Sequence, residues 1–102
     1  MGKLDLIEKS ADHSADVTTG SKEVVPVNKM RSSCLLVNDS DVVIYLGFGR
    51  DAALNIGLRL NAAGGAYEIS LANPYRGYIT AIHGGSGNKR LTITEVEGYV
   101  PD

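Results

Sequence analysis

Turn-forming residues divide the middle of this chain into short apolar segments. Between residues 31 and 95, clusters of Asn, Asp, Ser, Gly or Pro recur roughly every eight to twelve residues. An amphipathic helix needs an uninterrupted stretch of about ten to twelve residues, whereas strands are shorter. The spacing therefore predicts an all-β fold, a small antiparallel β-sandwich or barrel of about seven to eight short strands.

The clearest alternation of apolar and polar residues lies in the segment 52–60, AALNIGLRL. Leu54, Ile56, Leu58 and Leu60 are separated by single polar or small residues. In a strand all four would share one face, whereas in a helix, at about 100° per residue, they would scatter around the cylinder. The segment is predicted to be a strand whose four aliphatic side chains face the core.

Two other segments show the same period of two. Cys34 and Leu36 point to one side of a predicted strand over residues 33–37, and their neighbours point to the other. Near the end of the chain, Leu91 and Ile93 alternate with threonines. Leu91 and Ile93 are predicted to point inward, and the threonines outward.

The first part of the chain differs in composition from the rest. Residues 1–22 are rich in Ser, Thr, Asp and Lys, and their large aliphatic residues are Leu4, Leu6, Ile7 and Val17. Such a segment buries too little surface to offset its ordering entropy, so it is predicted to be a flexible, extended N-terminal arm preceding a β-sandwich over residues 23–102. The arm either has no role or orders against a neighbouring subunit. Pro26 assigns the extended piece around it, with Val24, Val25, Val27 and Met30, to a sheet edge or a strand start.

The charge balance excludes several classes of partner. Ten basic and twelve acidic side chains give a net charge of −2 without a run of like charge, so we expect no binding to nucleic acid. No segment approaches the roughly 20 apolar residues of a membrane span, and the N-terminus lacks the apolar core of a signal peptide. The expectation is synthesis in the cytoplasm and no membrane partner.

The segment following Val42 has the spacing of a dinucleotide-binding motif. Gly47-x-Gly49-x-x-Ala52 follows an apolar strand, and Glu68 lies about 20 residues further on. The motif requires a helix after the glycines. Because the alternation up to Leu60 indicates a strand there, a glycine-relieved bend in a β-strand is the preferred interpretation, and no cofactor is expected.

The sequence offers no catalytic or metal-binding pattern. His13 and His83 have no Cys or acidic partners at the spacing of metal ligands. Cys34 lies in an apolar run and is expected to be buried and inert. A nucleophile and base pair of Cys34 and His83 is the one enzymatic alternative kept. The prediction is a protein without catalytic, cofactor or metal residues.

Aromatic and arginine side chains in two loops are the candidates for a contact surface. Tyr75 and Arg76 lie in a proline-containing loop, and Phe48 and Arg50 flank the glycine bend. Tyr and Arg are enriched among residues that anchor interfaces. The alternative for Tyr75 is a lid that folds over the end of the core.

The order of several short motifs resembles that of short open reading frames among the structural genes of tailed bacteriophages. The resemblance covers residues 35–95 and leaves the first 22 residues unmatched. It is carried by Val37-Asn38-x-Ser40, Ile44-Tyr45-Leu46-Gly47, Gly57-x-x-Leu60, Ala63-Gly64-Gly65, Tyr67-Glu68-Ile69, Tyr78-x-x-Ala81-Ile82 and Leu91-Thr92-Ile93-Thr94-Glu95.

The resemblance implies a virion structural protein, and it brings no catalytic or ligand residues. The expected function is that of a capsid decoration or cement protein, which binds the major capsid protein and copies of itself as a dimer or trimer. An arm that orders on assembly and a sheet edge fit such a role. The alternative is a tail- or fibre-associated module that recognises a carbohydrate on the host surface through the loops around Phe48 and Tyr75.

Overall fold

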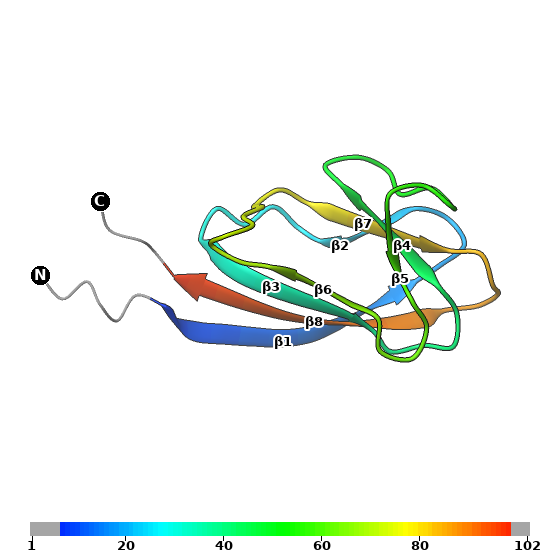
Figure 1. The fold of residues 1–102 in the computed structure, drawn as a ribbon, viewed down its shortest axis with the longest axis horizontal. Helices are drawn as coiled ribbons and strands as arrows, with labels where there is room; N and C mark the ends of the chain where they lie inside the picture. Colours follow the sequence, from blue (N-terminus) through cyan, green and yellow to red (C-terminus); the bar gives the residue numbers. More distant parts are fainter. Residues whose placement is uncertain (1–6, 99–102) are drawn as a thin grey trace, which may run out of the picture.

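The computed structural model describes residues 7–98, with side chains from residue 12 onward, and this part of the chain is built from eight strands (Figure 1). Residues 1–6 of the predicted arm and residues 99–102 lie outside the described residues. The strands are β1 (Ile7–Val17), β2 (Lys22–Val25), β3 (Arg31–Asn38), β4 (Ile44–Phe48), β5 (Leu58–Leu60), β6 (Ala66–Ile69), β7 (Ile79–His83) and β8 (Lys89–Gly98).

The strands form two four-stranded antiparallel sheets that pack face to face. One sheet has the order β1-β8-β3-β6 and the other has the order β2-β7-β4-β5. Strand β1 pairs with β8, β2 with β7, β3 with β6 and β4 with β5, and successive pairs alternate between the sheets. This is an antiparallel ribbon rolled into two layers, the jelly-roll topology. The predicted antiparallel β-sandwich is confirmed, and its strand order is now defined.

The core lies between the two sheets and is made of aliphatic side chains from both. Cys34 and Leu36 of β3 are fully buried, as are Leu91 and Ile93 of β8, which confirms the period of two in both segments. Burying one such aliphatic side chain contributes about 1.5–3 kcal/mol. The remaining members of the buried core cluster are Val17, Val24, Val25, Ile44, Leu46, Leu60, Ile69, Ile79 and Ala81.

The prediction for residues 52–60 is wrong over most of its length. Strand β5 is only Leu58–Leu60, and Leu60 alone of the four aliphatic residues is fully buried. Leu54 is 42% exposed and Ile56 is 57% exposed. They lie in a turn in which Asn55 adopts a φ of 65° and Gly57 a φ of 86°, both incompatible with a strand. The preferred strand interpretation is therefore corrected to a loop that precedes a short edge strand.

The segment predicted to be an arm contributes a strand to the sandwich. It is extended, as expected, and β1 pairs with β8 from Ile7, opposite Gly98, to Val17, opposite Lys89. Residues 7–17 therefore form an edge strand of the first sheet, although they belong to the segment 1–22 that was predicted to be an arm. The mobility of the arm stays a prediction. Strand β2 is also an edge strand, as the proline predicted, and it ends directly before Pro26.

Candidate functional site

Two of the four predicted contact residues pack against each other at the end of the sandwich where β1 begins and β8 ends. The rings of Phe48 and Tyr75 meet edge to face, with centroids 5.2 Å apart, and Tyr67 lies 5.7 Å from Phe48. The Tyr75 hydroxyl donates a 2.8 Å hydrogen bond to the Tyr78 carbonyl. All three rings are partly buried against the core. The geometry therefore gives Tyr75 the role of a lid and leaves part of its ring at the surface.

The structure brings the two predicted loops together. The Gly49 amide donates a 3.0 Å hydrogen bond to the Tyr78 carbonyl, which also accepts the Tyr75 hydroxyl. The exposed Arg76 side chain bends back, and its Nε donates to the Arg31 carbonyl at 2.8 Å. Arg50 is exposed, and its carbonyl accepts a 2.6 Å bond from the Thr80 hydroxyl. The contact roles of Phe48, Arg50, Tyr75 and Arg76 stay predictions.

A buried arginine, Arg31, holds this end of the sandwich together. Its side chain is fully buried, and its Nε donates to a Glu95 carboxylate oxygen at 2.5 Å. Its remaining nitrogens donate to three backbone carbonyls, those of Pro26, Tyr75 and Gly77, at 2.8–3.1 Å. One side chain therefore ties β3 to β8, to the end of β2 and to the loop before β7. The burial of Arg31 is not predictable from the sequence, because a charged residue ahead of an apolar run is normally exposed.

The two segments that the Arg31 clamp holds carry exposed aliphatic residues. Val27, Met30 and Leu71 are each at least half exposed. Val27 and Met30 lie in the β2–β3 connection, which is bonded to the 70–78 loop through the Asn28 amide and to β8 through the Met30 carbonyl. We call Val27, Met30, Leu71, Tyr75 and Arg76 the terminal-end surface.

Residues 49–57 form a loop that covers the outer face of the second sheet. Its start is fixed by the bond from Thr80 to the Arg50 carbonyl, and its middle by the Ala52 amide, which donates to Ser21 Oγ at 2.9 Å. A side chain at Gly47 would collide with the backbone of Arg50 and Ala52, so the close approach of the loop to β4 requires glycine there. In the second half of the loop, Leu54 approaches Gly84 of the β7–β8 turn.

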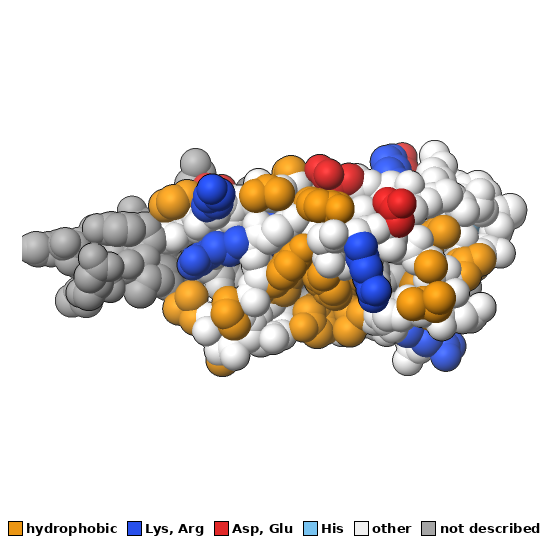
Figure 2. Space-filling model, turned by 90° about the horizontal axis from the view of Figure 1, so that it is seen from above, with side chains coloured by type: hydrophobic (Ala, Val, Ile, Leu, Met, Phe, Trp, Pro, Cys, Tyr) orange, Lys and Arg blue, Asp and Glu red, His pale blue; other side chains and the backbone are white. Residues whose placement is uncertain are grey.

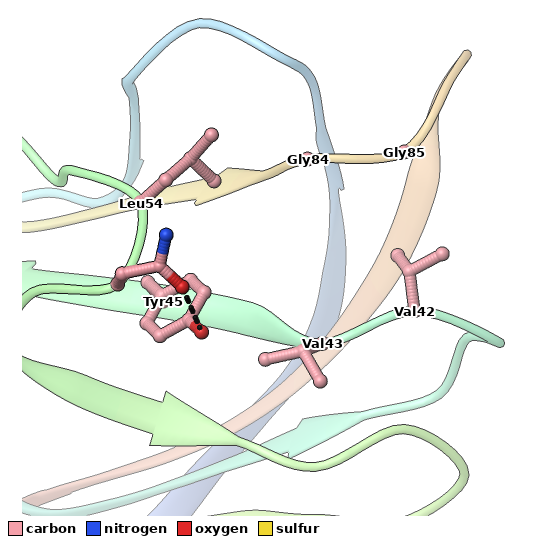
Figure 3. Close-up of a pocket in the computed structure, with 7 residues that line it drawn as sticks. Val42, Val43, Tyr45, Leu54, Gly84 and Gly85 are labelled. Carbon is pink, nitrogen blue, oxygen red and sulfur yellow. Dashed lines mark hydrogen bonds between the residues drawn. The ribbon is translucent and has the colours of Figure 1, made fainter.

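An open pocket of about 400 Å³ lies between this loop, the start of β4 and the β7–β8 turn (Figure 3). The Tyr45 hydroxyl donates a 3.0 Å hydrogen bond to Oδ1 of the exposed Asn55, and both residues line the pocket. Seen from the side of the second sheet, exposed hydrophobic side chains gather across the middle of the molecule and toward the right-hand end (Figure 2). The residues that line the pocket are Val42, Val43, Tyr45, Leu54, Asn55, Gly84 and Gly85.

The proposed nucleophile and base pair finds no support in the geometry. Cys34 is fully buried, and burial raises the pKa of its thiol to about 11. His83 is also buried, and both of its ring nitrogens are engaged by its own turn: Nδ1 accepts from the Gly85 amide at 3.0 Å, and Nε2 lies 2.7 Å from the Gly87 carbonyl. This pattern corresponds to a neutral imidazole that carries its proton on Nε2. His83 therefore shapes the turn that borders the pocket.

Among the described side chains, those of residues 12–98, the structure groups no three His, Cys, Asp or Glu as metal ligands. Among the same residues, no helix has the length and apolar character of a membrane span. Comparison of the chain with family models, with curated proteins and with solved structures gave no match.

Proposed function

We propose that the protein is a structural component of a bacteriophage virion, a homo-oligomeric module that decorates the capsid and cements its shell. The observation that carries this proposal is the jelly-roll strand order, β1-β8-β3-β6 against β2-β7-β4-β5. Viral capsid domains are among the proteins built on this topology. Because a fold hosts several functions, the proposal also depends on the phage-like order of motifs in residues 35–95. In this proposal the protein is made in the host cytoplasm and assembles onto the virion.

The terminal-end surface is the part of the molecule that we assign to the shell. Covering the exposed half of Met30 or Leu71 would contribute about 1 kcal/mol each. The four hydrogen bonds of Arg31 hold the loops that carry these side chains, so binding costs little ordering of the backbone. A modest affinity per copy is sufficient if linked copies bind the shell together.

Self-association is assigned to strand β1. It is an edge strand of eleven residues, and its outer side offers backbone groups to the edge of a second copy. Asp12 and Asp16 are exposed along it, so the pairing needs a register in which the carboxylates of the two copies do not lie directly opposite each other. A closed dimer or trimer is the expected product.

Co-sedimentation with empty phage shells that lack the protein tests the assignment to the capsid. The wild-type protein is expected to sediment with the shells at saturable stoichiometry. The double variant Met30→Ser and Leu71→Ser should bind about ten- to thirtyfold more weakly, since two side chains of about 1 kcal/mol each are lost. Ile56→Ser is the matched control and should bind like the wild type, because Ile56 is an equally exposed aliphatic residue that lies in the 49–57 loop, outside the terminal-end surface.

Failure of the wild-type protein to sediment with shells would contradict the proposal. Equal binding by the double variant would exclude the terminal-end surface as the contact. Size-exclusion chromatography with light scattering tests self-association separately, with a dimer or trimer expected. A monomer at all concentrations up to the millimolar range would contradict the role given to β1.

A further inference from the structure

The open pocket beside Tyr45 has the composition of a site for a small, neutral and amphipathic ligand. None of its seven lining residues is charged. Valine and leucine side chains supply apolar walls, the Tyr45 ring supplies an aromatic surface, and Asn55 and two glycine backbones supply hydrogen-bonding groups. Ligand sites typically combine such apolar walls with a few fixed polar groups.

The polar groups of the pocket are held in place before any ligand arrives. The Tyr45 hydroxyl donates to Asn55 Oδ1, so the two N–H groups of the Asn55 amide remain available as donors. The backbone of Asn55 is fixed in the left-handed region, at a φ of 65°, within a loop anchored to Ser21 and Thr80. On the opposite wall, His83 fixes the turn that contains Gly84 and Gly85. A preorganised site loses little conformational entropy on binding.

The exposure of Leu54 is a second observation that favours a ligand at this pocket. It stands 42% exposed at the rim of the pocket, on a loop whose backbone is fixed and cannot withdraw it from water. The open pocket of about 400 Å³ is near the lower limit of ligand sites, which span about 300–1,000 Å³. It therefore admits one ring-sized group.

We propose that this pocket binds one neutral hexopyranose ring of a saccharide. Such a ring has an apolar face of C–H groups, which fits the Tyr45 ring and the aliphatic walls, and a rim of hydroxyl groups, which accept from the Asn55 amide and donate to backbone carbonyls. The absence of a cationic group among the lining residues disfavours phosphate and carboxylate ligands. The proposal does not depend on the capsid assignment, because the pocket and the terminal-end surface lie on different parts of the molecule.

Nuclear magnetic resonance on the ¹⁵N-labelled full chain provides the test. The probes are glucose, galactose, mannose and N-acetylglucosamine, titrated separately to about 50 mM. We expect at least one sugar to shift the signals of the Asn55 side chain, Gly84 and Gly85 in a saturable manner. The dissociation constant should be on the order of 1–10 mM, since a single sugar ring makes few contacts.

Two variants assign the binding to the pocket. Asn55→Asp keeps the size of the side chain and tolerates the same φ but removes both amide donors, and Tyr45→Phe removes the hydroxyl that orients the amide. Each should weaken binding about three- to tenfold. The matched control is Asn73→Asp, which should leave binding unchanged. Asn73 lies in the predicted contact loop, and its amide donates a 2.7 Å hydrogen bond to the Tyr67 hydroxyl.

The proposal is overturned if none of the four sugars produces saturable shifts. It is equally overturned if Asn55→Asp binds as tightly as the wild type while its spectrum shows a folded protein. Loss of binding in Asn73→Asp but not in Asn55→Asp would move the saccharide site to the predicted loop and so also contradict the pocket assignment.

Discussion

Replacing the buried Arg31 by Met should strongly destabilise the protein. The variant loses the ion pair with Glu95 and the bonds to the Pro26, Tyr75 and Gly77 carbonyls. Removing one partner of a buried ion pair costs about 3–5 kcal/mol. The lower half of that range is expected, because the Glu95 side chain keeps 12% exposure and can reach water. A domain of this length has a total stability of only about 5–15 kcal/mol.

A second substitution separates the cost of the unpaired Glu95 carboxylate from the cost of the three carbonyls that lose their donors. In the double variant Arg31→Met and Glu95→Gln, the orphaned carboxylate is gone but the three carbonyls still lack their donors. The double variant should recover about 1–3 kcal/mol relative to Arg31→Met alone. Urea unfolding followed by circular dichroism measures both, with comparison of midpoints at a constant slope. A loss below 1 kcal/mol for Arg31→Met, or no recovery in the double variant, would refute the clamp.

Three further predictions follow from the packing. Leu60→Ala should cost about 2–5 kcal/mol and Ile56→Ala less than about 0.5 kcal/mol in urea unfolding; equal losses would restore the strand prediction for the whole segment. Gly65→Ala should cost about 1–3 kcal/mol in calorimetry, since its Cβ would lie 2.3 Å from a backbone nitrogen, while Gly20→Ala, with open space around it, should be neutral. The folded Cys34 thiol has its pKa raised from 9.0 to about 11, so folding stability should fall as the pH rises from 9 to 11, where only the unfolded thiol ionises. At pH 8 a thiol reagent should modify Cys34 only at the rate of global unfolding, and fast modification of the native protein would contradict its burial.

The general fold could be predicted because its signals are local. The alternation around Leu36 and around Ile93 follows from the pleat of a half-buried strand, and both segments occupy central positions in their sheet. Pro26 predicted a sheet edge because it lacks the N–H that a further neighbour would need, and β2, which ends directly before it, is an edge strand. The strand order could not be predicted, because it depends on pairings between residues as distant as Val17 and Lys89.

The alternation in residues 54–60 led to a wrong strand prediction. Apolar residues in a loop can follow a period of two by chance. Asn55 and Gly57 carried the opposing signal, since these two residue types tolerate positive φ better than others. Leu54 and Ile56 are exposed because the turn points them outward. An alternating pattern interrupted by Asn and Gly is better interpreted as a turn.

Strand β1 was not predicted because residues 1–22 contain few apolar residues. An edge strand packs only a few inward side chains, and β1 needs only Ala15 and Val17 to contact the core over its described side chains. Most of its pairing is backbone hydrogen bonding to β8, which any polar residue can provide. Hydrophobic content therefore underestimates strands of this kind.

The sites were harder to predict than the fold. The rings of Phe48 and Tyr75 meet and pack against the core, and the contact role predicted for them stays a prediction. The Arg31–Glu95 pair joins residues 64 positions apart, and nothing in either neighbourhood indicates the other. The pocket draws its lining from three separate segments, so only the folded chain reveals it.

Electron cryomicroscopy of phage shells saturated with the protein tests the central claim most directly. The account predicts extra density on the outer surface of the shell that accommodates the eight-stranded sandwich, with the 26–30 and 70–78 loops toward the major capsid protein and β1 next to a second copy. Shells without added density, or density in which the terminal-end surface faces solvent, would contradict it.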